Sequence, residues 1–379
     1  MNSLLSFNRL QAMITKEFVQ MRRDRFTFAM MIGIPLLQLT IFGLAINMNP
    51  RHLPTAVLCA DNSAFSRSIL QAVASTDYFA LTRVAESEAE LDRLLQLGTV
   101  QFGVQIPEDF SRRLLRGEQP PILVQADATD PAATGNAVAA LQELAASALD
   151  HDLKGPLARL RGSASLPFQV VLHRKYNPEI LTQNNIVPGL LGVVLTMTMV
   201  MITTLAITRE VERGTMENLL ATPIRPIEVM IGKIVPYILV GYVQTGLILC
   251  VAHFFFHVPA RGSIPLLLAA MFLFIVANLA VGITFSTVGR NQLQAVQMSF
   301  FFFLPSLLLS GFMFPFRGMP EWAQGIGEVL PLTHFLRIVR GILLKGNGIP
   351  EIAPDLWAIF LFLVVMMSVG VKRYRQTLD

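Results

Sequence analysis

Two pairs of residues have the type and spacing that could support chemistry. His253 and His257 are four residues apart, so on a helix they would share one face and could bind a metal ion. No carboxylate or cysteine accompanies them, which favours the alternative of a polar pair at a membrane interface. Gly232-Lys233 could end a nucleotide-binding P-loop, but Ile227 stands where that loop requires its first glycine. The sequence therefore predicts no metal site, no catalytic residue and no ATP site within the chain.

A charged loop between two long apolar stretches, residues 208–230, is the third candidate site. Its spacing of Glu and Leu is typical of a short helix, Gly214 allows a turn, and Pro223 stops the helix. Charged side chains could orient such a helix in a cleft of a partner protein. Alternatively, the helix lies in solvent and is stabilised by its own ion pairs. The candidate residues are Arg209, Glu210, Glu212, Arg213, Gly214, Thr215 and Glu217.

The apolar residues on either side of this loop are gathered into runs of about 20, the length that a helix needs to cross a membrane. Charged residues make up only 15% of the chain, against about 25% in soluble domains. As bounded here, none of the runs contains Asp, Glu, Lys or Arg. The sequence therefore predicts an α-helical polytopic membrane protein with six transmembrane helices. These cover residues 26–46, 186–207, 234–256, 264–285, 295–314 and about 356–371, the alternative for the last being an earlier start near Ile352.

The distribution of Lys and Arg predicts the orientation. The short segments on one side would carry 13 of these residues and those on the other side 5. Because short cytoplasmic loops are enriched in Lys and Arg, both termini are expected in the cytoplasm and residues 47–185 outside. The run at 26–46 is too long and starts too late for a cleaved signal peptide, so it is expected to remain as an anchor. The basic excess fits anionic lipid headgroups, and nothing indicates a nucleic-acid partner.

Residues 47–185 are predicted to form an extracytoplasmic α/β domain, because strand-like and helical runs alternate along them. Ser63 and Ser87 are candidate helix N-caps, and Ser87 with Glu90 has the spacing of a capping box. The domain lacks Gly-x-Ser-x-Gly, His-Glu-x-x-His and Cys-x-x-Cys motifs, so it carries no catalytic signature. The expected strands are 55–60, 79–84, 100–106 and 122–126, and the expected helices are 63–74, 87–97, 108–116 and 131–153.

Two further segments are amphipathic. Residues 1–25 are predicted to form a helix in the membrane interface, the alternative being a positive flank that only sets the orientation. Residues 315–350 are too polar for a full crossing, but apolar runs at 326–330 and 335–344 lie on either side of Pro331. We expect two short re-entrant helices buried against protein, the alternative being an ordinary loop.

The chain offers no energy source of its own. It has no P-loop, and no predicted span contains an acidic residue that could couple transport to protons or sodium. If the chain performs work, a partner must supply the energy. We therefore expect the charged loop to be the site where that partner binds.

At this point the motifs resemble those of the membrane subunit of ATP-binding-cassette exporters, in the drug and lipid export branch of the ABC-2 permeases. Residues 209–215, Arg-Glu-Val-Glu-Arg-Gly-Thr, are similar to the Arg-Glu-x-Glu-x-Gly-Thr signature of that group. Leu-Leu at 219–220 and Thr-Pro at 222–223 follow it. The resemblance covers essentially the whole chain. Further matches are Asn177-Pro178, Leu309-Ser-Gly311, Met319-Pro320, and the series Pro331, Phe335, Arg340 and Gly346.

The resemblance implies a permease that is not itself an enzyme and that lies in the bacterial inner membrane, with residues 47–185 in the periplasm. A separate ABC ATPase would bind ATP and Mg²⁺. The loop 208–230 would dock on that ATPase beside a connecting helix around Lys16 and Glu17. Two permeases, identical or related, would form a dimer with the second and fifth spans lining the path between them. A periplasmic adaptor protein and membrane lipids are further candidate partners.

Spans without charge suit a hydrophobic or amphipathic substrate. Adaptable side chains that could line its path, or simply face lipid, are Met197, Met201, Phe300, Phe301 and Phe303. Met197 and Met201 would share one helix face. A different function stays open, that of a membrane sensor or scaffold whose outer domain binds a ligand or a partner protein, although the cytoplasmic segments leave no room for an output domain.

Overall fold

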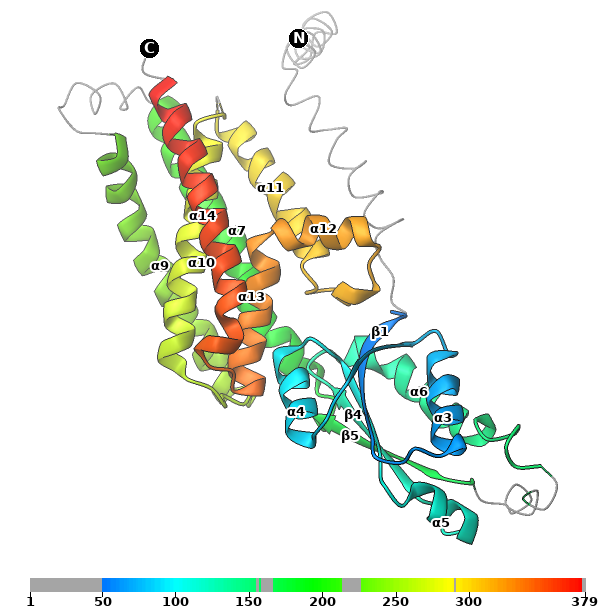
Figure 1. The fold of residues 1–379 in the computed structure, drawn as a ribbon. Helices are drawn as coiled ribbons and strands as arrows, with labels where there is room; N and C mark the ends of the chain where they lie inside the picture. Colours follow the sequence, from blue (N-terminus) through cyan, green and yellow to red (C-terminus); the bar gives the residue numbers. More distant parts are fainter. Residues whose placement is uncertain (1–49, 155–156, 158–165, 213–225, 290, 377–379) are drawn as a thin grey trace, which may run out of the picture.

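The computed structural model describes residues 50–376, apart from 155–156, 158–165, 213–225 and 290. The predicted helix at 1–25, the predicted span at 26–46 and most of the loop 208–230 lie outside the described residues. The described chain has two parts, an α/β region and a bundle of long helices (Figure 1). We refer to the end of the bundle that meets the sheet as the α/β end and to the opposite end as the loop end.

The α/β region is built on a five-stranded mixed sheet with the order β2-β1-β3-β4-β5. Strand β1 pairs in parallel with both β2 and β3, β4 is antiparallel to β3, and β5 is parallel to β4. The edge strand β5 was not predicted, because its apolar run is short and is followed by the basic residues His173, Arg174 and Lys175. The strands are β1 (Leu53–Cys59), β2 (Phe79–Val84), β3 (Phe102–Ile106), β4 (Pro121–Asp127) and β5 (Gln169–Lys175).

Four helices cover this sheet. The helices α3 (Ala64–Ala74), α5 (Phe110–Arg116) and α6 (Pro131–Ser147) share one apolar core with it. Helix α4 (Glu88–Leu97) packs in a separate apolar cluster with β1. All four helices were predicted, although α6 ends before residue 153.

The two predicted serine caps are present. The Ser63 hydroxyl accepts a hydrogen bond from the backbone N–H of Ser66 at 3.2 Å, and Ser87 accepts one from the N–H of Glu90 at 3.2 Å. The carboxylate of Glu90, however, accepts from the N–H of Glu86 and not from that of Ser87. These caps satisfy backbone donors that a helix start would otherwise leave unpaired.

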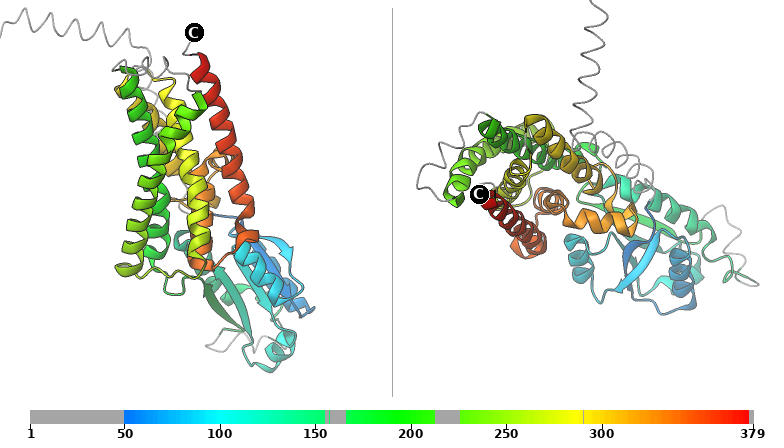
Figure 2. Two further views of the ribbon diagram at one scale, coloured as in Figure 1. Left: turned by 90° about the vertical axis from the view of Figure 1, so that its left-hand side faces the viewer. Right: turned by 90° about the horizontal axis from the view of Figure 1, so that it is seen from above.

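Five helices of the bundle are long and apolar enough to cross a membrane. They run side by side (Figure 2), and α10 is largely buried among the others, whereas only small shares of α9 and α14 are buried. Such exposure is expected of helices that face lipid or a second protein. The five are α7 (Thr182–Glu212), α9 (Pro226–Phe254), α10 (Ile264–Ser286), α11 (Gln292–Leu309) and α14 (Ile349–Gln376).

The last helix differs from the prediction. Helix α14 begins at Ile349, so it includes Glu351 and Asp355, and the statement that the spans lack acidic residues is wrong for this helix. Both carboxylates have partners that let them lie in its first two turns. Glu351 accepts a hydrogen bond from the N–H of Gly348 at 2.9 Å, and Asp355 is bonded to His334.

The segment 315–350 contains a 3₁₀ turn, η3 (Phe316–Gly318), two short helices and a π-helical turn, η4 (Gly341–Lys345). The helices are α12 (Glu321–Val329) and α13 (Pro331–Arg340), so Pro331 separates them as predicted. Helix α12 lies across the direction of the long helices, whereas α13 is buried in the bundle (Figure 1). The Phe335 ring of α13 stacks on Phe274 of α10, with centroids 4.1 Å apart. The depth of both helices in the membrane stays a prediction.

Candidate coupling and docking sites

Helix α7 connects the two ends of the bundle. Its 31 residues form one helix, which at a rise of about 1.5 Å per residue is about 45 Å long. It begins beside the sheet and ends at the loop end (Figure 1), where Arg209 is exposed and Glu210 and Glu212 occupy the last turn. The other predicted coupling residues lie outside the described residues, so their role stays a prediction. They are Arg213, Gly214, Thr215, Glu217, Lys16 and Glu17.

Glu212 contacts the start of helix α11. Its Oε1 accepts a hydrogen bond from the backbone N–H of Gln292 at 2.8 Å, and its Oε2 accepts one from Nε2 of Gln292 at 2.6 Å. The hydrogen bond from the Gln292 side chain, with that from its backbone, lowers the pKa of Glu212. Asn291 caps the same helix by accepting from the N–H of Gln294 at 2.8 Å. A carboxylate at a helix N-terminus also interacts favourably with the helix dipole.

The opposite end of the bundle binds the α/β region at the C-terminus of helix α4. Three side chains from the segment between α11 and α14 donate to three carbonyls there. Lys345 donates to Leu95 O at 3.1 Å, Asn347 to Gln96 O at 3.4 Å and Arg317 to Gly98 O at 3.2 Å. The last carbonyls of a helix have no partner within it and carry partial negative charge, so cationic donors satisfy them well.

A partly buried arginine joins α7 to the same contact. Arg340 donates to Asn185 Oδ1 at 2.9 Å and to Gly311 O at 3.2 Å. Asn185, in the first turn of α7, donates in turn to Thr129 O of the α/β region at 2.7 Å. The beginning of α7, the end of α13 and the α/β region are therefore held together by one set of polar contacts.

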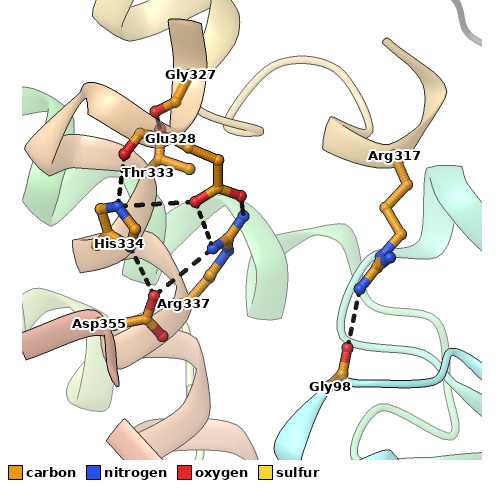
Figure 3. Close-up of polar contacts among 8 residues, drawn as sticks. All are labelled: Gly98, Arg317, Gly327, Glu328, Thr333, His334, Arg337 and Asp355. Atoms are coloured by element: carbon orange, nitrogen blue, oxygen red, sulfur yellow. Dashed lines mark hydrogen bonds and ion pairs between the residues drawn. The ribbon is translucent and has the colours of Figure 1, made fainter. Parts of the chain in front are cut away.

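A cluster of charged side chains connects helices α12, α13 and α14 (Figure 3). Arg337 bonds both oxygens of Glu328, at 3.0 and 2.5 Å, and lies 3.6 Å from Asp355. His334 Nδ1 is 2.7 Å from Asp355, and its Nε2 is 2.8 Å from Glu328 O. Opposite charges at such distances compensate the cost of removing each from water. The cluster fixes α12 and α13 against the first turns of α14.

Sequence reasoning missed these polar contacts. It used Arg340 in the family resemblance and counted the other arginines and Lys345 of this segment only toward the orientation of the chain. The spacing of His334 and Arg337, three residues apart on a short helix that follows a proline, was a signal that both could face one partner. No sequence signal showed that the partners of Lys345 and Arg317 would be carbonyls of α4.

The five predicted path residues do not share one surface. Met197, Phe300 and Phe301 are exposed, Met201 is half-buried, and Phe303 packs against the core of the bundle. Their role in lining a path stays a prediction. His253 and His257 are also exposed, and the described part of the chain contains no group of three or more side chains that could hold a metal ion.

Known proteins resemble this chain over most of its length. A family described as "ABC-2 family transporter protein" matches residues 25–372. The Escherichia coli K12 protein named "Probable multidrug ABC transporter permease YbhS" is 32% identical over 372 residues, which are 97% of each chain. The "Inner membrane transport permease YhhJ" of the same organism is 29% identical over 334 residues, which are 86% of each chain.

A longer relative matches over only part of its own length. "ABC transporter G family member 20" of Dictyostelium discoideum is 23% identical to 94% of this chain, but the match covers 50% of that protein. The family match spans the first predicted span, the α/β region, the charged loop and all five described spans. The chain therefore belongs to the ABC-2 transporter family, whose members form the membrane part of ABC transporters.

Proposed function

We propose that this chain is the permease subunit of an ABC exporter, which moves a hydrophobic or amphipathic compound outward with energy from ATP hydrolysed by a separate subunit. The observation that carries the proposal is the single helix α7, which extends from the α/β end of the bundle to the charged loop 208–230. A helix continuous between the two ends can transmit a displacement from one to the other, because packed helices move as rigid elements.

The chain lacks the motifs that would let it supply its own energy for transport. The chain has no P-loop, so it has no means of its own to bind the phosphates of ATP in that way. The one acidic residue well inside a described span, Asp355, is bonded to His334 and only 19% exposed. Because its carboxylate is already hydrogen-bonded, Asp355 is better suited to a structural role than to binding a coupling ion.

The orientation of the proposed subunit follows from charge. The loop end carries the basic end of α14, with Lys372 and Arg373, and the end of α7. Basic residues next to spans favour the cytoplasmic side of the inner membrane. We therefore assign the loop end to the cytoplasm, where an ABC ATPase would bind it, and the α/β region to the periplasm, where it would also be open to an adaptor protein.

The substrate path is proposed at the contact between two permease copies. Met197 of α7 and Phe300 and Phe301 of α11 are exposed large apolar side chains on the second and fifth predicted spans. Burial of such side chains against a second copy or a related chain would remove them from lipid contact while leaving adaptable surface for an apolar compound. Phe303 is excluded from this surface, because it packs inside the bundle.

The proposal is tested by co-expressing the chain with the ABC ATPases of its own genome, purifying the complex and reconstituting it in lipid nanodiscs. The parent chain should co-purify with the ATPase and change its rate of ATP hydrolysis. Arg213→Glu, in the proposed docking loop, should weaken co-purification at least tenfold. The matched control is Arg51→Glu in the α/β region, where Arg51 forms an exposed ion pair with Asp77 and lies 6.0 Å from the centre of the Tyr78 ring. A parent chain that neither binds the ATPase nor alters its turnover would disprove the proposal and favour a sensor or scaffold.

A further inference from the structure

We infer that Glu212 is a positioning residue that joins the charged loop to helix α11, and that it acts through this contact and not by binding the ATPase directly. The inference rests on the proposed function and assigns one step within it. The sequence alone places Glu212 among the residues that would bind the ATPase. The geometry gives it a partner inside the chain.

Both carboxylate oxygens of Glu212 accept a hydrogen bond from Gln292. One accepts from the backbone N–H of Gln292 and the other from the side-chain amide of the same residue. Charge-assisted hydrogen bonds of this kind are stronger than neutral ones. Each oxygen keeps a further acceptor position, but a partner protein could draw Glu212 away from α11 only by breaking both bonds.

The position of Gln292 makes the contact a connection to a whole helix. Gln292 is the first residue of α11, and its backbone N–H is one of the donors that a helix start leaves unsatisfied. A force on that backbone N–H moves the helix backbone itself. A force on a side chain in the middle of a helix can instead be absorbed by a change of rotamer. Movement of the last turn of α7 therefore displaces the start of α11 directly.

A second contact deeper in the bundle lets the two helices move together. Thr204 of α7 lies 3.4 Å from the hydroxyl of Ser299 in α11, and its own hydroxyl is 3.2 Å from Gly282 O of α10. All three positions are buried. Helices α7 and α11 are thus connected twice, by the exposed Glu212 contact at the loop end and by the buried Thr204 contact within the bundle. Helix α11 also carries the exposed Phe300 and Phe301.

The chemistry of the pair allows a test by exchange. In the double variant Glu212→Gln/Gln292→Glu, the new amide at position 212 can accept from the backbone N–H of position 292 through its oxygen. Its NH₂ can donate to the new carboxylate at position 292. Both hydrogen bonds are rebuilt, while the charge at position 212 is lost. A residue that binds the ATPase through its charge would not be rescued by this exchange.

The experiment measures how α11 responds to nucleotide in the complex with the ATPase. Spin labels are placed at Leu293→Cys of α11 and Lys372→Cys of α14, both exposed positions, after Cys59→Ser and Cys250→Ala. Labelled chain is diluted with unlabelled chain so that each complex carries one labelled copy. Pulsed electron paramagnetic resonance then gives the distance between the labels without nucleotide and with ATP and vanadate.

The parent should show a nucleotide-dependent change of this distance. Glu212→Ala should reduce the change by at least half, Gln292→Ala should reduce it less because the backbone bond remains, and the exchange variant should restore it. The control is Glu118→Ala in the α/β region, whose carboxylate takes part only in exposed ion pairs with Arg113 and Arg116.

Three results would overturn the inference. The first is a parent that binds the ATPase without any change of the distance, and the second is Glu212→Ala with an undiminished change. The third concerns rescue. If Glu212→Ala loses ATPase binding or the distance change, and the exchange variant restores neither, Glu212 is a direct contact of the ATPase. A parent that does not bind the ATPase at all disproves the proposed function itself, and the inference falls with it.

Discussion

Nζ of Lys345 lies 2.5 Å from Oδ2 of Asp127, and each side chain is less than 10% exposed. Lys345 belongs to the π-helical turn after α13, and Asp127 ends strand β4, so the pair joins the bundle to the α/β region. Lys345 also donates to Leu95 O and lies 5.2 Å from the ring of Tyr176. Burial raises the pKa of Tyr176, and the negative charges of Asp127 and Asp92 raise it further, which keeps this hydroxyl protonated beside the ion pair.

Lys345→Met should destabilise the protein strongly. The substitution leaves Asp127 buried without its cation, and breaking one side of a buried ion pair costs about 3–5 kcal/mol. We expect the free energy of unfolding of the purified full chain in mixed micelles to fall by about that amount. The double variant Lys345→Met/Asp127→Leu should recover much of the loss, because no unpaired charge remains. Arg51→Met, at an exposed ion pair, should change stability by less than about 1 kcal/mol, and an equal effect at both sites would contradict the prediction.

Two polar pairs of the cluster in Figure 3, Glu328 with Arg337 and His334 with Asp355, should differ in strength. The side chains of Glu328 and Arg337 are 44% and 40% exposed, whereas those of His334 and Asp355 are 9% and 19% exposed. Solvent weakens the first pair to about 0.5–1 kcal/mol, but a shielded hydrogen bond to a charged group contributes about 1.5–3 kcal/mol. Double-mutant cycles with Glu328→Gln/Arg337→Gln and His334→Ala/Asp355→Ala measure both coupling energies. A larger coupling for the exposed pair would refute this order.

Local signals in the sequence located most elements of the fold. Ser63 and Ser87 marked helix starts because their side chains cap backbone N–H groups there, and Pro331 separated two short helices because it lacks a backbone donor. Apolar runs located the five described spans. The start of α14 was predicted at about 356 or near Ile352 and lies at Ile349. Glu351 and Asp355 interrupt the apolar pattern there, and their tertiary partners make them compatible with a helix.

The contacts that join the two parts of the chain could not be predicted in the same way. Arg317, Lys345 and Asn347 bond carbonyls that lie 219, 250 and 251 positions earlier in the chain. Every residue has a backbone carbonyl, so the residue type at these positions does not indicate that the carbonyl will accept a tertiary hydrogen bond. The bond between Glu212 and Gln292 spans 80 positions and likewise depends on how α7 packs beside α11.

Gly192→Ala should destabilise the bundle, since α13 packs closely on α7 at this position. An added Cβ would lie 2.8 Å from Cδ1 of Leu332 and 2.9 Å from Cδ1 of Phe335, two fully buried side chains. Overpacking of this kind costs about 1–3 kcal/mol. Gly246→Ala on α9 is the matched control, because its Cβ would meet no atom within 4 Å. Unfolding of the two variants in mixed micelles should separate them, and an equally stable Gly192→Ala would show that α13 is free to shift.

Asp61→Asn should lower stability at neutral pH but not in acid. The Asp61 carboxylate accepts hydrogen bonds from the hydroxyls of Ser63, Ser66 and Ser111, at 2.7, 2.5 and 3.1 Å, and thereby ties the starts of α3 and α5 together. Burial alone would raise the pKa of Asp61, but these hydrogen bonds outweigh it and lower the pKa below the ordinary value of 3.8. A folded-state pKa below the unfolded one means that the stabilisation is complete above 3.8 and is lost as the pH falls through the folded value. The difference in melting temperature between parent and Asp61→Asn should therefore be constant above about pH 5 and shrink below 3.8. A difference that stays constant throughout the acid range would show that the carboxylate charge contributes nothing.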